Sequence, residues 1–515
     1  MTNVVKSGFA ALTLAILAAC GGGGGGTSGG ASAPASTPPP AGTQTVLTVA
    51  ASVQALAGQT DALFSGAGPT TSAQSQSLND GCFLNNGFTK ALNIANVDAD
   101  IPQFLASNAF RIGSTRTNVR VITVYNEVNP EGSSRTIADV LYDINYTDGS
   151  KDKDAKNVMV SGSTSGLCAT SQSSAEWRFL GNQEIVGFNV QARNIRNEQR
   201  NKTTGDLLQA AALYTNALQF NVTDPRGLAT YAVVTGPGTT TISGVATPFS
   251  IKLLSTKVLR EDPLLVGKRS NFTNWTANDS FRICRIPSTA FQVPASAADC
   301  VNNTSGNLRG TDLPVPATGG VPASAITFFD SAFANLGFVV GGEYTVKIYN
   351  DDGWKTVNGQ AGKTPIATYT AVNDSLPYTF LQMVGTVDLE DHRFAKLLTN
   401  SLTTFSAAAA AISSSTPSTF AITWSAPQQP NDGRAFRFTE VGEFFQGVKT
   451  GIAPGAFNPA ERYYKPTYFT GNTTSAPALA ITPAPSTIQN KSYAEFSLNY
   501  TDRNSGRIIS TISFQ

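Results

Sequence analysis

Five cysteines are the residues best suited to chemistry in this sequence. Cys82, Cys168, Cys284 and Cys300 lie in the body of the chain, and an even number of cysteines is typical of disulfide-bonded proteins of oxidising compartments. Four cysteines allow three pairings, and the sequence does not choose among them. We favour Cys82–Cys168 and Cys284–Cys300, because each pair then lies within one predicted domain. A metal site is disfavoured, since the chain has no CxxC spacing and a single histidine.

The sequence lacks the residue pattern that nucleophilic catalysis usually requires. A Ser-His-Asp or Cys-His site needs a base beside the nucleophile. The single histidine, His392, stands in LEDHRF, where we interpret it as a solvated surface residue. The string closest to a Gly-x-Ser-x-Gly elbow covers 162–166 and has Thr164 at its centre. We therefore predict that the protein is not an enzyme and has no cofactor.

The string GQAGKTP at 359–365 contains the end of a phosphate-binding loop. Val357 stands where the first glycine of that motif belongs, and Pro365 would block the helix that must follow. We interpret this string as a hairpin turn.

Two acidic clusters offer oxygen ligands for calcium: DGSKDKD, with Asp148, Asp152 and Asp154, and NDDG, with Asp351 and Asp352. Two lysines interrupt the first cluster, and neither cluster continues to the glutamate of an EF-hand loop. Because aspartate and glycine are ordinary turn residues, we interpret both clusters as turns.

A short basic run could bind an anion or lipopolysaccharide. It contains Arg193, Arg196, Arg200 and Lys202, with Glu198 inside it and no aromatic residue interleaved. These features favour a solvated loop.

The first twenty residues, MTNVVKSGFAALTLAILAAC, have the layout of a secretory signal. Lys6 is followed by an apolar run over 8–17 and by small residues before Cys20. The run is about half the ~20 residues that a membrane-spanning helix needs, so we predict cleavage rather than a permanent span.

The stretch Leu17-Ala18-Ala19-Cys20 resembles the lipobox of bacterial lipoproteins. The resemblance implies a cut before Cys20 and fatty acylation of that cysteine, palmitate included, since stable anchoring requires more than one acyl chain. Gly21 stands where many inner-membrane lipoproteins have aspartate. The resemblance therefore implies lipid attachment to the outer membrane.

The charge composition limits the classes of partner that the protein can bind. The chain of 515 residues has 36 basic and 35 acidic residues, and this balance argues against nucleic acid, whose binding depends on many phosphate-neutralising cations. The length suits about three domains. We expect the membrane as a partner through the lipid anchor, together with another envelope protein or a glycan.

The chain divides into a signal peptide at 1–19, a tether at 20–43 rich in glycine, proline and serine, and three predicted domains at 44–204, 205–374 and 375–515. The tether has no residues that could build a core.

In the first domain, apolar residues at helical spacing in TQTVLTVAASVQALAGQ predict an amphipathic helix, and PQFLASNAF predicts a second. NVRVITVYNEV and SRTIADVLYDINYTDGS flank the turn NPEG as a long hairpin, and NVMVSGS, AEWRFLGN and EIVGFNVQARN continue the sheet. This α+β order weakly resembles the NTF2-like fold, whose curved sheet wraps on helices.

The second and third domains have short alternating strands between glycine, proline and asparagine turns, which predict β-sandwiches. GEYTVKIYNDDG and PIATYTAV are similar to late strands of immunoglobulin-like domains, and TFAITWSAP resembles the second strand of fibronectin type III domains. HRFAKLLTNSLTTFSAAAAAI predicts a helix in the third domain. The fold class is therefore multidomain and mainly β, with an N-terminal α+β domain before two Ig-like sandwiches.

We expect a lipid-anchored protein of the bacterial cell envelope with a structural, adhesive or binding role, facing the periplasm or the outside. Two alternatives stay open. One is a small-ligand carrier or enzyme that uses an NTF2-like pocket with Asp, Tyr and Arg. The other is a carbohydrate-binding surface protein in which exposed Trp275 or Trp354 stacks on sugars, whereas Trp177 and Trp424 are expected inside their strands.

Overall fold

The computed structural model of this protein is mainly β and contains several sheets, as the sequence predicts. It describes residues 46–128, 134–149, 151–161, 168–169, 176–208, 212–242, 245–262, 280–284, 292–293, 308–309, 312–314, 330–331, 334–355, 359–384, 394–398, 420–424, 436–449, 461–469, 478–481, 488–501 and 506–514.

The chain forms two compact units, and each unit combines several stretches. Unit 1 contains 1–190, 220–312 and 339–374, and unit 2 contains 191–219, 313–338 and 375–515. The predicted domain ranges 44–204, 205–374 and 375–515 stay a prediction.

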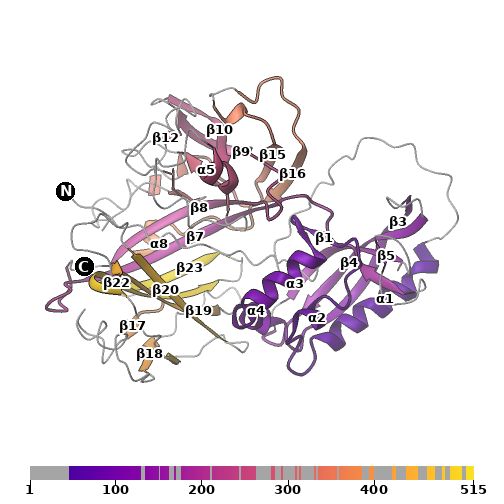
Figure 1. Ribbon diagram of the computed structural model, residues 1–515, viewed down its shortest axis with the longest axis horizontal. Helices are drawn as coiled ribbons and strands as arrows, with labels where there is room; N and C mark the ends of the chain where they lie inside the picture. Colours follow the sequence, from indigo (N-terminus) through magenta and orange to yellow (C-terminus); the bar gives the residue numbers. More distant parts are fainter. Residues whose placement is uncertain are drawn as a thin grey trace. The chain divides into compact units, whose positions relative to one another are not determined.

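The first part of unit 1 places helices against an antiparallel sheet (Figure 1). Its helices are α1 (Val46–Leu63), α2 (Ser72–Ser75), α3 (Lys90–Ala99) and α4 (Ile101–Asn108), followed by the 3-10 turn η1 (Ala109–Arg111), and β1 (Leu84–Asn85) and β2 (Phe88–Thr89) form a small hairpin. The sheet has the order β3 (Thr115–Val128), β4 (Ser134–Asn145), β5 (Lys151–Ser161) and β6 (Trp177–Phe179).

The core of this part lies between α1 and the sheet. Val49, Val53 and Leu56 recur at helical spacing on α1, and all three are buried against alternating residues of β4 such as Val140 and Tyr142. The predicted helices and the predicted β3–β4 hairpin are therefore confirmed, because local periodicity and burial agree.

A second sheet of unit 1 has the order β13 (Leu308–Arg309), β11 (Arg282–Cys284), β10 (Val245–Leu254), β9 (Tyr231–Ile242), β15 (Glu343–Tyr349) and β16 (Ala367–Val372), with β12 (Gln292–Val293) beside β9. Helix α5 (Thr256–Glu261) follows β10, and the 3-10 turn η4 (Gly353–Lys355) follows β15. Phe220, Phe249 and Tyr344 pack edge to face or tilted beneath it, with ring centroids 5.0 to 5.5 Å apart.

Unit 2 is built on a seven-stranded sheet. Its order is β14 (Asp312–Pro314), β8 (Leu213–Thr223), β7 (Gly187–Arg200), β23 (Arg507–Phe514), β22 (Ile488–Thr501), β19 (Arg437–Lys449) and β20 (Glu461–Tyr468). Strand β23 runs parallel to β7 although more than three hundred residues separate them, and antiparallel to β22. Strands β7 and β8 connect the two units along the chain, since each has residues in both.

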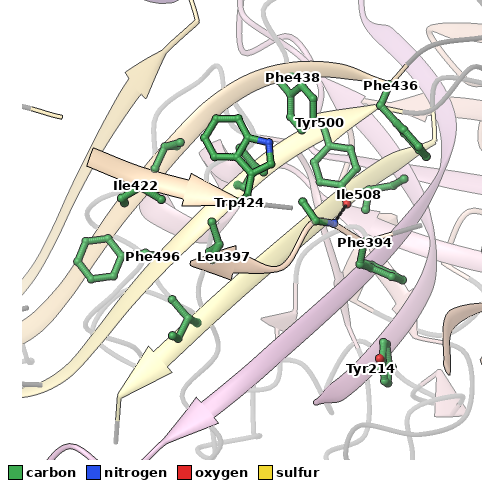
Figure 2. Packing of buried hydrophobic residues seen from close by; sticks show 14 of the residues in the cluster. Tyr214, Phe394, Leu397, Ile422, Trp424, Phe436, Phe438, Phe496, Tyr500 and Ile508 are labelled. Carbon is green, nitrogen blue, oxygen red and sulfur yellow. Dashed lines mark hydrogen bonds between the residues drawn. The ribbon is translucent and has the colours of Figure 1, made fainter. Parts of the chain in front are cut away.

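A three-stranded sheet of β17 (Leu397–Leu398), β18 (Phe420–Trp424) and β21 (Ala478–Ile481) completes the core of unit 2, and α8 (Phe380–Val384) contributes Phe380 and Met383. Figure 2 shows Trp424 of β18 beside Phe438 and Tyr500 of the larger sheet. The Tyr500 hydroxyl accepts a hydrogen bond from the Ala395 backbone N–H at 2.9 Å. Two sheets thus face each other across an aromatic core.

Three sequence predictions were wrong in part. Leu397–Leu398, inside the predicted helix at 392–412, is a strand paired with Trp424 and Thr423. Arg193, Arg196 and Arg200 lie on β7 rather than in a loop, because β23 supplies a strand partner that the local sequence does not reveal.

The third concerns the first acidic cluster. Asp152 and Asp154 lie on β5, since the turn ends before Lys151.

Among the helices that the structure describes, none is both long enough and apolar enough to cross a membrane.

Candidate functional site at the disulfide bond

A disulfide bond joins Cys82 to Cys168 across 86 residues of sequence, with their Cα atoms 4.7 Å apart. This is the pairing that we favour from the sequence. Cys168 is 1% exposed, and the bond ties the segment after α2 to the connection between β5 and β6.

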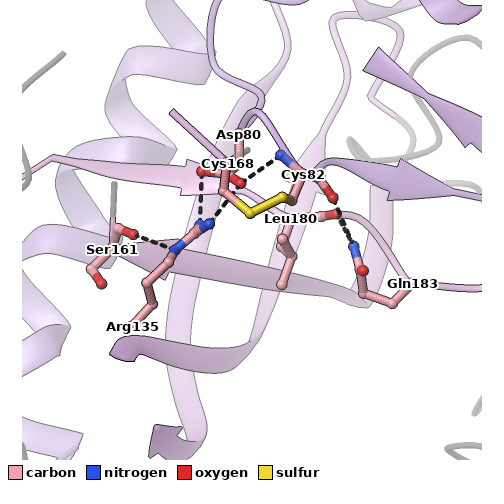
Figure 3. The surroundings of a disulfide bond; sticks show 7 residues. All are labelled: Asp80, Cys82, Arg135, Ser161, Cys168, Leu180 and Gln183. Carbon is pink, nitrogen blue, oxygen red and sulfur yellow. Dashed lines mark hydrogen bonds and ion pairs between the residues drawn. A yellow bond between two sulfur atoms is a disulfide. The ribbon is translucent and has the colours of Figure 1, made fainter. Parts of the chain in front are cut away.

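Asp80, two residues before Cys82, is the centre of the site (Figure 3). Its Oδ1 accepts hydrogen bonds from the Cys82 backbone N–H at 2.9 Å and from Arg135 Nη1 at 3.0 Å. Its Oδ2 lies 2.7 Å from Arg135 Nη2. Oδ1 of the carboxylate therefore accepts one guanidinium and one backbone hydrogen bond, and Oδ2 makes an ion-pair contact with the same guanidinium.

Arg135 comes from β4, and its Nε donates to the backbone carbonyl of Ser161 on β5 at 3.2 Å. The Arg135 and Asp80 side chains are 5% and 0% exposed. Both charges are thus removed from water, which is tolerated because each group is paired and hydrogen-bonded.

Two further cations lie near Asp80. Arg178 of β6 is 2% exposed and pairs with Glu176, whose Oε2 lies 2.7 Å from Nη2. Lys90 donates from Nζ to the Asn79 carbonyl at 2.7 Å. Burial lowers the pKa of Arg178 and of Lys90, and the negative charge of Asp80 opposes both shifts.

We call Asp80, Arg135 and the Cys82–Cys168 disulfide the clamp, because together they join β4, the segment after α2 and the β5–β6 connection. The Asp80 carboxylate and the two sulfur atoms lie within 4.8 Å of one another. However, both sulfurs are used in the disulfide, and the carboxylate is paired with Arg135. A metal ion would have to break both contacts, and three cationic side chains stand around it. In the described part of this cluster no nucleophile stands beside a base.

Glu184 lies a few residues beyond the clamp. Burial raises the pKa of its carboxyl to about 7, and Lys156 of β5 opposes the shift. The neighbouring Ile185 N–H donates to the Tyr369 hydroxyl at 2.9 Å, which ties this segment to β16. Glu184 is therefore a group that titrates near neutral pH at a joint within unit 1.

A second set of polar groups enters the core between α1 and the sheet. Asn157 Nδ2 donates to the Tyr142 hydroxyl at 2.7 Å, and the Tyr146 hydroxyl donates to Asp152 at 2.5 Å. All four residues are less than a tenth exposed. Their side chains satisfy one another in pairs.

Several predicted site residues lie outside the described residues. They are Cys20, Cys300, His392 and Trp275, and the pairing of Cys284 with Cys300 therefore stays a prediction, although Cys284 itself lies on β11.

The other acidic residues considered as calcium ligands do not lie around a common site. Asp154 pairs with Arg120, and Asp152 accepts from Tyr146. Asp351 accepts from the Gly353 N–H at 2.7 Å and from the Tyr231 hydroxyl at 3.1 Å, as a turn residue does. The interpretation of NDDG as a turn is confirmed.

The exposed fraction of each described tryptophan tests whether it lies in the core or could stack on a sugar. Trp177 and Trp424 are 7% and 2% exposed, as expected for core residues. Trp354 is 2% exposed, so the idea that it forms an exposed sugar-stacking surface is wrong: its ring is packed inside, with Lys355 Nζ 5.6 Å from the ring centroid.

The sequence analysis missed Asp80, Arg135 and Arg178. In the sequence each is a charged residue beside a turn or on an alternating strand, where exposure is the usual outcome. The only available signal was the nearness of Asp80 to Cys82 in NDGC.

The comparisons with known proteins add no relative to this picture: no protein-family model matches the chain, and no curated protein matches it.

Proposed function

We propose that this chain is a lipoprotein of the bacterial outer membrane, anchored through lipid on Cys20, with a structural, adhesive or binding role in the cell envelope. Its partners would be the membrane and another envelope protein or a glycan. In this proposal the α+β part is NTF2-like, and the following β parts are Ig-like domains held away from the membrane by the tether at 20–43.

The observation that carries the proposal is the buried Cys82–Cys168 disulfide in a chain that also has the lipobox-like stretch ending at Cys20. Disulfides persist in oxidising compartments, and a lipobox directs a chain across the inner membrane into one. The two features are independent, since one comes from the fold and the other from the leader. The clamp supports a structural rather than a catalytic role.

Metabolic labelling with an alkyne fatty acid tests the anchor. We expect the full chain to be labelled and to sediment with membranes, and Cys20→Ser to lose both properties. Ser36→Ala in the tether is the matched control and should behave as wild type. Equal labelling of Cys20→Ser would overturn the proposal.

A small-ligand role is the second candidate, and one observation favours it. Tyr142, Tyr146, Asp152 and Asn157 bring hydroxyl, carboxylate and amide groups into one core. Asp and Tyr are two of the three residue types expected for a pocket without histidine, and Asn stands here in place of Arg. Replacing Tyr146 with Phe should abolish binding of a small polar ligand while unfolding shifts little. An unchanged ligand profile would leave only a structural role for these pairs.

A further inference from the structure

Strand β3 is an open edge. In the described part of the chain it pairs with β4 alone, and the sheet order ends at β3. The segment 123–128 pairs regularly with β4, after a bulge between Val121 and Thr123. Among the described strands none covers its outer edge, and an uncovered edge is the template onto which another strand adds.

Three large apolar side chains on this edge are exposed. Ile122 is 50% exposed, Tyr125 is 45% exposed and Val128 is 57% exposed. Each would be better buried, because apolar area removed from water stabilises by about 25 cal/mol per Å². Proteins protect such edges with charged residues, proline or bulges; the segment 122–128 begins at a bulge, has no lysine or proline, and has Glu127 as its one charged residue.

The spacing of the three residues is symmetric about Tyr125. If a second β3 runs antiparallel, with the two-fold axis through Tyr125, residues equally distant from Tyr125 on either side face each other. Tyr125 then faces Tyr125 of the second copy, and Ile122, the extra residue of the bulge, lies near Val128. Aromatic and β-branched cross-strand pairs of this kind stabilise sheets.

The charged residues of β3 are compatible with this antiparallel register. Glu127 faces Thr123 of the second copy, so no like charges stand opposite each other. Asp139 accepts from the Thr123 hydroxyl at 2.6 Å, and Arg120 is paired with Asp154. A lipid anchor would add to the effect, because confinement to one membrane raises the effective concentration of edges.

We propose that two copies of this chain associate edge to edge through β3, antiparallel and centred on Tyr125, to form one continuous sheet. The interaction surface is the segment Ile122–Val128, and its partner is a second copy. The inference does not depend on the ligand of the protein.

Cysteine trapping in the full membrane-bound chain tests the register. Opposed residues in an antiparallel pair have Cα atoms about 4.5–5.5 Å apart, within the range of a disulfide. Tyr125→Cys should therefore form a disulfide-linked dimer when envelope membranes are oxidised with copper phenanthroline. Glu127→Cys is the matched control, because its two copies would stand roughly 14 Å apart along the strands.

A mixed experiment fixes the pairing further. Differently tagged Thr123→Cys and Glu127→Cys chains, expressed together, should yield the heterodimer as the main cross-linked species. Each of these side chains lies on the exposed edge strand, so folding should be unaffected, and secondary structure by circular dichroism checks this.

The proposal is supported if Tyr125→Cys dimerises at least fivefold more than wild type and Glu127→Cys does not. It is overturned if Tyr125→Cys stays monomeric, or if both variants cross-link equally.

Discussion

Asp80 and Arg135 lose nearly all contact with water, although both carry charge. A buried pair contributes little when intact, because desolvation offsets the attraction between the charges. Removing one partner is different, since the other charge then stays buried and uncompensated.

We therefore expect Asp80→Asn to lower the free energy of unfolding by about 3–5 kcal/mol. Arg120→Gln, which breaks the exposed pair with Asp154, should cost below about 1 kcal/mol. Urea unfolding followed by tryptophan fluorescence measures both. Equal effects would show that burial does not distinguish the two pairs.

Glu184 gives the stability of unit 1 a pH dependence. Its pKa is raised to about 7 by burial, so between about pH 4.5 and 7 the folded chain keeps a proton that the unfolded chain releases. The free energy of unfolding should then fall by about 3 kcal/mol as pH rises across this window.

Glu184→Gln cannot ionise and should remove this part of the slope, so it is expected to be more stable than wild type near pH 8 and similar below pH 4.5. Urea midpoints at the two pH values provide the measurement. A slope identical in variant and wild type would assign the pH dependence to other groups.

At the scale of elements, the disulfide adds a covalent link between the segment of Cys82 and the β5–β6 connection, beside the backbone hydrogen bonds that join Leu78 and Asp80 to Phe179 of β6. Replacing Cys82 and Cys168 together with serine should cost about 2–5 kcal/mol. The loss should concentrate in the α+β part, which hydrogen exchange of residues 78–90 would report. An equal loss of hydrogen-exchange protection across all described residues would contradict a local role of the disulfide.

The second predicted disulfide is checked chemically. Peptides from the unreduced chain should include one in which Cys284 is linked to Cys300, with a mass two hydrogens below that of the separate thiols. Alkylation of both cysteines without prior reduction would show that they are free.

Local elements were predictable because their signals are local. The helical spacing of Val49, Val53 and Leu56 and the turn between two alternating runs lie within short windows. The β7–β23 pairing gives no such signal, since the chemistry of Arg193–Arg200 does not reveal a partner near residue 510. Leu397–Leu398 follows the same rule: its spacing suits a helix, but tertiary pairing with β18 makes it a strand.

The clamp was unpredictable for a related reason. Burial of Asp80 depends on Arg135 and Ser161, which are contributed by two strands far along the chain. The Cys82–Cys168 pairing was one of three that the sequence allowed, and it was favoured only because both cysteines lie within one predicted domain.

At the scale of the whole molecule, the sheet of unit 2 depends on β23, which lies between β7 and β22. A chain stopped before Arg507 would leave the edges of both neighbours unpaired and remove Ile508, Ile512 and Phe514 from the core. We expect such a chain to aggregate or be degraded. Its yield in the envelope membranes, compared with that of the exposed-edge variant Val128→Lys, tests this expectation. Equal yields would mean that β23 is dispensable.

The parallel pairing of β7 with β23 also has a consequence for the order in which the protein matures. A chain that crosses a membrane from its amino end delivers β7 some three hundred residues before β23 arrives. At the 5–20 residues per second typical of synthesis, β7 would wait for roughly 15–60 seconds with an open edge. During this interval the Cys82–Cys168 bond can already form, because both cysteines precede β7. If the chain is exported as proposed, the amino-terminal part can be oxidised before the sheet of unit 2 is complete.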